Sequence, residues 1–252
     1  MRRVGIIGTG HVGGPMAVYC AKQGRSVTVS ERSQGHSQKL AAAYENISIA
    51  DNQGVIDASE IVILALRPHI WKEVVAPLDF REGQQVISVM AGVSMAEMAE
   101  VCAPVTDFSA TIPLSFIQDG GCPLPVYPSA EPLQSLFGAD NPVLPVASEH
   151  ALNQHFAAST LLSAVLGVME TGADWLGDVT GDRVSAEIYV ASLLAGYLAD
   201  ISKDGQGRLA EAKWGLATEG TLNLQMVDGL KQGGVETVLH ETLAGLGKRM
   251  EN

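Results

Sequence analysis

The sequence predicts an α/β fold in two parts, a doubly wound parallel sheet over residues 1–148 and an all-helical part over residues 149–252. Two observations predict this division. Apolar segments of strand length alternate with segments of helical periodicity in the first part, which is the pattern of a sheet covered by helices. Beyond Ser148 the strand pattern stops, and the chain becomes rich in alanine and leucine at helical spacing.

The elements of the first part follow one another in regular order. A buried strand is expected at Val4–Ile7, then a helix, and then a second strand that closes at Glu31. The later strands are expected at 47–50, 60–66, 85–90 and 105–111, and the later helices at 34–44, 69–75 and 94–103. Ser94 is the expected N-cap of the last of these helices. A proline-rich stretch, 120–145, has room for one or two short strands that finish the sheet.

The second part is predicted to be helical throughout. Its helices are expected at 151–175, 184–201, 209–217, 222–232 and 235–250. The segment 160–168 is apolar on nearly all sides, and such a helix is buried on all sides. About 100 residues offer too little surface to cover it, so a second copy is expected to supply the other wall. We therefore expect a homodimer, or a higher homo-oligomer, formed through the C-terminal helices.

The most informative motif is a glycine-rich turn directly after the first strand, with the pattern GxGxxG. The first glycine permits a tight turn, the second lets the backbone approach a pyrophosphate, and the third lets the following helix pack closely. N–H groups at the start of that helix then face the phosphates. This pattern in this context predicts a Rossmann-type dinucleotide site. Its predicted cofactor-binding residues are Gly8, Thr9, Gly10, His11, Val12 and Gly13.

The end of the second strand bears on the choice of nicotinamide cofactor. Glu31 lies about 20 residues after the glycines, where an acidic side chain can bind the ribose hydroxyls of NAD. Arg32 and Ser33 are the residue types that a 2′-phosphate needs, since a guanidinium pairs with phosphate oxygens and a hydroxyl donates to them. NADP is therefore favoured, and Glu31 keeps NAD open.

Composition excludes several classes of partner. The 28 acidic and 16 basic residues give a net charge of −12, which disfavours nucleic acid and anionic membranes. No run of about 18 consecutive apolar residues occurs, so no membrane span is expected. The three cysteines, Cys20, Cys102 and Cys122, have no metal-ligand spacing, and no metal site is expected. Reduced thiols of this kind are typical of a cytoplasmic protein.

Taken in order, six segments resemble the pyrroline-5-carboxylate reductases. They read GIIGTGHVGG (5–14), RS (32–33), LALRPH (64–69), VISVMAGVS (86–94), SATIPLSF (109–116) and ATEGTLNLQMVDGLKQGG (217–234). The resemblance implies that two further turns border the cofactor. The residues it adds to the predicted cofactor site are Leu66, Arg67, Pro68, Ala91 and Gly92.

The same resemblance implies where the substrate binds. In that family a turn before a helix holds the substrate carboxylate through backbone N–H groups, while a threonine hydroxyl contacts the ring nitrogen. Here the turn begins at Thr218 and Glu219, and Leu222 and Asn223 stand where the family has two threonines. An amide at position 223 both donates and accepts, so it can replace a hydroxyl. The predicted catalytic residues are Asn223, Thr218, Thr221 and Ser115.

The implied activity is NAD(P)H-dependent reduction of a small cyclic imine, most simply 1-pyrroline-5-carboxylate to L-proline. A different imine or ketone substrate on the same scaffold is the first alternative, because Glu219 opposes a carboxylate substrate. Alcohol oxidation of the β-hydroxyacid dehydrogenase type ranks lower, since neither Lys203 nor Lys213 is followed four residues later by asparagine. A non-enzymatic, NADPH-binding sensor that signals through its helical dimer is the alternative from another class.

Overall fold

A computed structural model describes residues 2–31 and 34–251 of the chain. The chain forms two compact units, the first made of Met1–Ala157 with Gly247–Asn252 and the second of Ala158–Leu246. The boundary predicted after residue 148 rests on composition, whereas these units rest on contacts, so that boundary stays a prediction. Arg32 and Ser33, which we predicted to hold a 2′-phosphate, lie outside the described residues.

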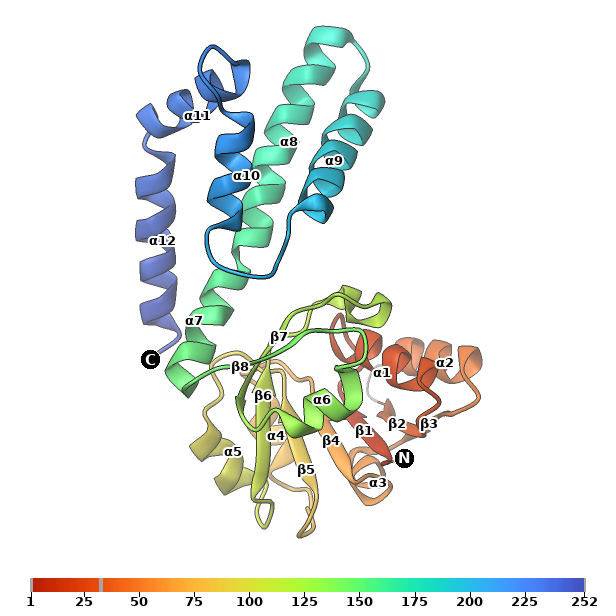
Figure 1. Ribbon diagram of the computed structural model, residues 1–252. Coiled ribbons are helices and arrows are strands. Elements are labelled where there is room, and N and C mark those ends of the chain that lie inside the picture. The colour runs from red at the N-terminus through yellow and green to blue at the C-terminus, as the bar shows by residue number, and fades with distance from the viewer. Residues whose placement is uncertain (1, 32–33, 252) are drawn as a thin grey trace. The chain divides into compact units, whose positions relative to one another are not determined.

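The first unit is built on an eight-stranded sheet in the order β3-β2-β1-β4-β5-β6-β7-β8 (Figure 1). Its strands are β1 (Val4–Ile7), β2 (Val27–Ser30), β3 (Ile47–Ala50), β4 (Ile61–Leu64), β5 (Gln85–Ser88), β6 (Asp107–Thr111), β7 (Leu124–Pro128) and β8 (Val143–Pro145). The strands β1 to β6 are parallel to one another. The predicted doubly wound sheet is therefore confirmed.

Helices cover both faces of this sheet, as the alternation of strands and helices predicts (Figure 1). Alternate residues of β1 and β4 enter two separate apolar clusters, so that Ile6 packs on one face and Ile7 on the other. The first cluster lies under α1 and α6, and the second lies under α3, α4 and α5. The bounds are α1 (Gly13–Lys22), α2 (Gln34–Ala43), α3 (Asn52–Asp57), α4 (Trp71–Val75), α5 (Met95–Val101) and α6 (Glu131–Phe137).

Three features of this unit go beyond the sequence-based expectation. Helix α6 lies in the proline-rich stretch, where only short strands were expected. Helix α3 was not predicted, although Asp51 caps it by accepting a hydrogen bond from the Gly54 N–H at 2.7 Å. Strand β7 runs antiparallel to β6. The link between them contains only the short 3₁₀ helix η2 (Ser115–Asp119), which is not the helical crossover that parallel neighbours require.

The second half of the chain is helical, as predicted. Its helices are α7 (Glu149–Ser159), α8 (Leu161–Thr180), α9 (Arg183–Asp200), α10 (Arg208–Leu216), α11 (Leu222–Gln232) and α12 (Val235–Arg249). The prediction of a single helix over 151–175 is wrong in two respects, because the helix is interrupted at Thr160 and α8 continues to Thr180. Gly181 stops α8 with a φ of +75°, a left-handed conformation that glycine adopts without a side-chain clash.

Unit Ala158–Leu246 exposes much apolar surface in the single chain. Helices α8 and α9 pack side by side (Figure 1), yet Val168 is 63% exposed and Ile188 is 62% exposed. The apolar segment that we expected to be buried is thus not covered by this chain. By length and composition alone, residues 149–180 could also cross a membrane, whereas no membrane span was expected from the sequence. One helix of this kind is weak evidence, since a helix in the core of a water-soluble protein passes the same test.

Candidate functional site

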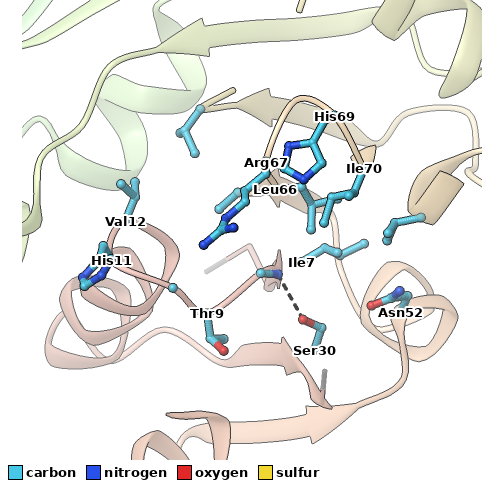
Figure 2. A pocket seen from close by; sticks show the side chains of 15 residues that line it. Ile7, Thr9, His11, Val12, Ser30, Asn52, Leu66, Arg67, His69 and Ile70 are labelled. Carbon is cyan, nitrogen blue, oxygen red and sulfur yellow. Dashed lines mark hydrogen bonds between the residues drawn. The ribbon is translucent and has the colours of Figure 1, made fainter. Parts of the chain in front are cut away.

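A pocket of about 600 Å³ lies at the carboxyl ends of β1 and β4, around the glycine-rich turn (Figure 2). In a doubly wound sheet, ligands bind beyond the carboxyl ends of the strands, where the strand order reverses. Here that reversal is at β1, which has β2 on one side and β4 on the other. The lining residues are Ile7, Gly8, Thr9, Gly10, His11, Val12, Ser30, Asn52, Ala65, Leu66, Arg67, His69, Ile70, Val74 and Val89.

The three glycines of the turn have different surroundings. Gly8 has a φ of +101°, and a Cβ atom there would lie 2.3 Å from the Ala65 carbonyl oxygen. A Cβ atom on Gly13 would lie 1.9 Å from the Gly8 carbonyl oxygen, so helix α1 approaches the turn as closely as only glycine allows. At Gly10 nothing lies within 4 Å of such an atom. The turn is therefore tightly packed at Gly8 and Gly13 and open at Gly10, and this open side suits a phosphate group.

Helix α1 directs unpaired backbone donors toward this open side. The Gly14 N–H bonds the Gly10 carbonyl at 3.1 Å, and this is where helical hydrogen bonding begins. The N–H groups just before it have no helical acceptor, as at every helix start. Together with the helix dipole, such groups bind anions.

Helix α1 is held at its far end by a buried tyrosine. The Tyr19 hydroxyl donates to the Asp140 carboxylate at 2.9 Å, and its ring packs against Phe137 at 5.4 Å between centroids. Burial, and then the bond to Asp140, raise the pKa of Tyr19 to about 12, so the phenol stays protonated. Both ends of α1 are thus fixed, and the turn has a rigid support.

Arg67 brings a positive charge into the pocket. Figure 2 shows its side chain extending over the turn from the loop after β4, and His69 follows from the same loop. No carboxylate of the described residues forms an ion pair with Arg67. A guanidinium that has no carboxylate partner is suited to bidentate pairing with a phosphate. A nicotinamide dinucleotide therefore fits the donors and the charge of this pocket.

The structure brings some of the predicted cofactor residues together and leaves others apart. Within the turn, Gly8 to Val12 line the pocket, as do Leu66 and Arg67 from the next loop. Gly13 lies below the turn as the first residue of α1. The predicted residues that do not line this pocket are Glu31, Pro68, Ala91 and Gly92. Their contacts with a cofactor remain predictions.

Eight lining residues were not among the predicted cofactor-binding residues, namely Ile7, Ser30, Asn52, Ala65, His69, Ile70, Val74 and Val89. Ser30, the last residue of β2, accepts a hydrogen bond from the Gly8 N–H at 3.0 Å (Figure 2). Asn52 is at the start of α3, and Val74 is on α4. Ser30 directly precedes Glu31, and this position was its only signal in the sequence.

The predicted catalytic residues lie in two different units, so each stays a prediction. Ser115 begins η2 in the first unit. Thr218, Thr221 and Asn223 lie in the second unit, around the start of α11. Thr221 is the N-cap of that helix, because its hydroxyl accepts from the Leu224 N–H at 3.2 Å. The same hydroxyl donates to the Thr218 carbonyl at 2.7 Å.

The described residues contain no cluster of three or more histidine, cysteine, aspartate or glutamate side chains that could hold a metal. The three cysteines are buried and form no disulfide. Burial raises the pKa of Cys20 and of Cys102 to about 12, so both remain thiols at neutral pH.

Comparisons with known proteins agree with this geometry. Residues 3–92, which contain the pocket's turn and loops, match the family described as NADP oxidoreductase, coenzyme F420-dependent. Over 108 residues the chain is 27% identical to a pyrroline-5-carboxylate reductase of Corynebacterium melassecola, a match that covers 40% of either chain. The chain thus matches less than half the length of this curated relative.

Solved structures extend the likeness to nearly the whole chain. The 1-pyrroline-5-carboxylate reductase of Streptococcus pyogenes matches with a TM-score of 0.80 and 20% identity, over 99% of this chain and 98% of that one. The chain has the fold of the pyrroline-5-carboxylate reductases. The Plasmodium falciparum enzyme with NADP bound matches at TM-score 0.79 and 12% identity, over 99% and 97%. An imine reductase from a Pseudomonas species matches at 0.63 and 17%, over 97% and 87%. The resemblance stated from the motifs is therefore confirmed.

Proposed function

We propose that this chain is an NADPH-dependent reductase of a small cyclic imine, with 1-pyrroline-5-carboxylate to L-proline as the leading case. The observation that carries the proposal is the pocket around the glycine-rich turn, with Arg67 over it, in a chain that matches a 1-pyrroline-5-carboxylate reductase over 99% of its length. The sequence match to a curated enzyme of that name supports it independently.

Bound NADPH supplies the hydride for such a reaction, which goes to the imine carbon while a proton goes to the ring nitrogen. The protein has to position both molecules, exclude water and donate a hydrogen bond to that nitrogen. The single hydrogen of the Thr221 hydroxyl is already donated to Thr218. We therefore assign the donor role to the exposed amide of Asn223, and we assign anchoring of the turn to Thr221.

The preference for NADPH over NADH rests on positive charge near the predicted phosphate positions. Arg67 has no ion-pair partner among the described residues, and Arg32 directly follows Glu31 in the sequence. Both side chains end in a guanidinium group, which donates hydrogen bonds to phosphate oxygens. In a chain with a net charge of −12, they supply the local attraction that a 2′-phosphate needs.

We further propose that the protein is a soluble cytoplasmic dimer whose exposed helical surface packs against a second copy. Helix α8 carries Glu170, Asp174 and Asp178, and the last two lie beside Arg183 of α9. Charged groups in this number are costly inside a bilayer. Exposed apolar side chains on two neighbouring helices, such as Val168 of α8 and Ile188 of α9, instead favour a protein interface.

The test is consumption of NADPH by the purified protein with 1-pyrroline-5-carboxylate, beside piperideine and thiazoline carboxylates and an NADH control. Turnover of the first compound with NADPH, lost in Asn223→Ala and kept in Thr221→Ser, would support the assignment. Absence of turnover with all three carboxylates, despite tight NADPH binding, would contradict the proposal and leave two candidates, an imine without a carboxylate and the non-enzymatic sensor.

A second candidate is an imine without a carboxylate. Glu219 repels a carboxylate substrate, and Leu222, the first residue of α11, is 81% exposed. The imine reductase among the structural matches supports this candidate. Faster turnover of 1-pyrroline than of its 5-carboxylate, reversed in Glu219→Gln, would favour it.

A further inference from the structure

A chain of hydrogen bonds, here called the hydroxyl chain, lies beneath the glycine-rich turn: the Thr9 hydroxyl bonds the Ser37 hydroxyl, which bonds the backbone carbonyl of Ser30. Thr9 lies in the turn, Ser30 ends β2, and Ser37 lies on α2. The Thr9 and Ser37 oxygens are 3.0 Å apart, and the Ser37 oxygen is 2.7 Å from the Ser30 carbonyl oxygen. Thr9 and Ser30 are each 1% exposed and Ser37 is 0% exposed, so water does not compete for these bonds.

The direction of the chain follows from the number of hydrogens. A serine hydroxyl has one hydrogen, and a carbonyl can only accept, so Ser37 donates its hydrogen to Ser30. Thr9 must then be the donor in its bond to Ser37. The Ser30 side chain closes the loop by accepting from the Gly8 N–H at 3.0 Å. Two successive residues of the turn are thus tied to β2, and one of them through α2.

We infer that Ser37 is a positioning residue for the cofactor, which fixes the glycine-rich turn in its binding conformation without touching the ligand. The inference rests on the proposed binding of a nicotinamide dinucleotide to that turn. Ser37 is fully buried and does not line the pocket, whereas both of its connections, Thr9 and Ser30, do.

Fixing the turn before the cofactor arrives should strengthen cofactor binding. N–H groups of the turn bind a phosphate well only when they already point to one place, because ordering them on binding reduces affinity. The turn is expected to face the pyrophosphate, which NADPH and NADH share. Loss of the Ser37 hydroxyl should therefore weaken both cofactors by a similar factor and leave kcat unchanged.

The experiment compares dissociation constants for NADPH and NADH in Ser37→Ala, Thr9→Val and Ser59→Ala, with the thermal midpoint of each apo protein. Ser59 is the matched control, since it is also 0% exposed and donates to a backbone carbonyl, that of Val55, at 2.6 Å. It lies before β4, at the opposite end of that strand from the pocket. Thr9→Val keeps the side-chain shape and removes only the donor.

We expect both cofactors to bind about threefold to tenfold more weakly in Ser37→Ala and in Thr9→Val, the range that one hydrogen bond covers. Ser59→Ala should lower the thermal midpoint but not the affinity. Equal affinities in Ser37→Ala and the native protein would overturn the inference alone, as would a loss confined to NADPH. A native protein that binds neither dinucleotide would overturn the inference and the proposed function together, whereas cofactor binding without imine turnover would overturn only the latter.

Discussion

A single added methyl group at Gly13 tests whether the close approach of α1 to the turn determines cofactor binding. In Gly13→Ala the new Cβ atom would lie 1.9 Å from the Gly8 carbonyl oxygen, and real Cβ atoms essentially never come within 3.0 Å of a neighbour. The contacting atom belongs to backbone, so no side chain can rotate away. Helix α1 or the turn must move by about 1 Å or more.

Overpacking of this kind costs about 1–3 kcal/mol, and the helix propensity of alanine returns at most about 1 kcal/mol. The neighbouring Gly14→Ala is the matched control, since its Cβ atom would lie 3.4 Å from the Thr9 carbonyl oxygen, an ordinary contact. Urea unfolding should show a loss of stability in Gly13→Ala and no loss in Gly14→Ala. Equilibrium titration should show NADPH affinity at least about tenfold lower in Gly13→Ala, because the displaced N–H groups no longer converge on the phosphate.

Equal stability and equal affinity of the two variants would refute this reasoning. A loss of stability without a loss of affinity would refute only its second half, because the turn would then tolerate displacement of the helix.

Three other predictions concern charge and burial. Arg67→Met should weaken NADPH binding about tenfold and Arg67→Lys less, as measured by fluorescence titration, because only a guanidinium pairs with a phosphate in bidentate fashion; equal losses would argue against the phosphate contact. The bond from Lys72, and then the bonds from Ser94, lower the pKa of Glu97, so its contribution is present above the carboxyl pKa of the unfolded chain and is lost as pH falls through the folded one. Glu97→Gln should therefore cost about 1 kcal/mol in urea unfolding at pH 7 and progressively less as the pH is lowered through the folded-state pKa of Glu97, and a cost independent of pH would contradict the assignment. The three cysteines should not react with a disulfide reagent at pH 8 until the protein is unfolded, since each is buried and each thiol pKa is raised by burial; rapid reaction of any one in the native protein would show that its cover opens.

The sheet could be predicted because its strands are buried on both faces and are therefore almost uninterrupted apolar runs. Segments such as Ile61–Leu64 have no other plausible conformation in this context. Helix α3 was missed because it has only six residues and a glycine near its centre, so no periodic pattern develops. The break at Thr160 was missed for the opposite reason, because helix-forming residues continue on both sides of it.

The candidate site was predictable where it is contiguous in sequence. The turn from Gly8 to Val12 was predicted from its GxGxxG pattern, and Arg67 was predicted because its segment resembles one of the pyrroline-5-carboxylate reductases. Ser30 and Asn52 enter the pocket only because parallel strands end at the same edge, and the sequence does not reveal which end residues point inward. The substrate-binding residues were predicted only from the resemblance, because Ser115 and Asn223 are far apart in the chain and belong to different units.

The hydroxyl chain beneath the turn also restricts how this sequence can evolve. Positions 9 and 37 are 28 residues apart in the chain, yet loss of the Ser37 hydroxyl leaves the buried Thr9 hydroxyl and the Ser30 carbonyl without that partner. Substitutions that keep the fold should therefore occur in combination, so that a relative with an apolar residue at the position of Ser37 also lacks a hydroxyl at that of Thr9. These positions are separate in the sequence, but their side chains depend on one another for hydrogen bonds.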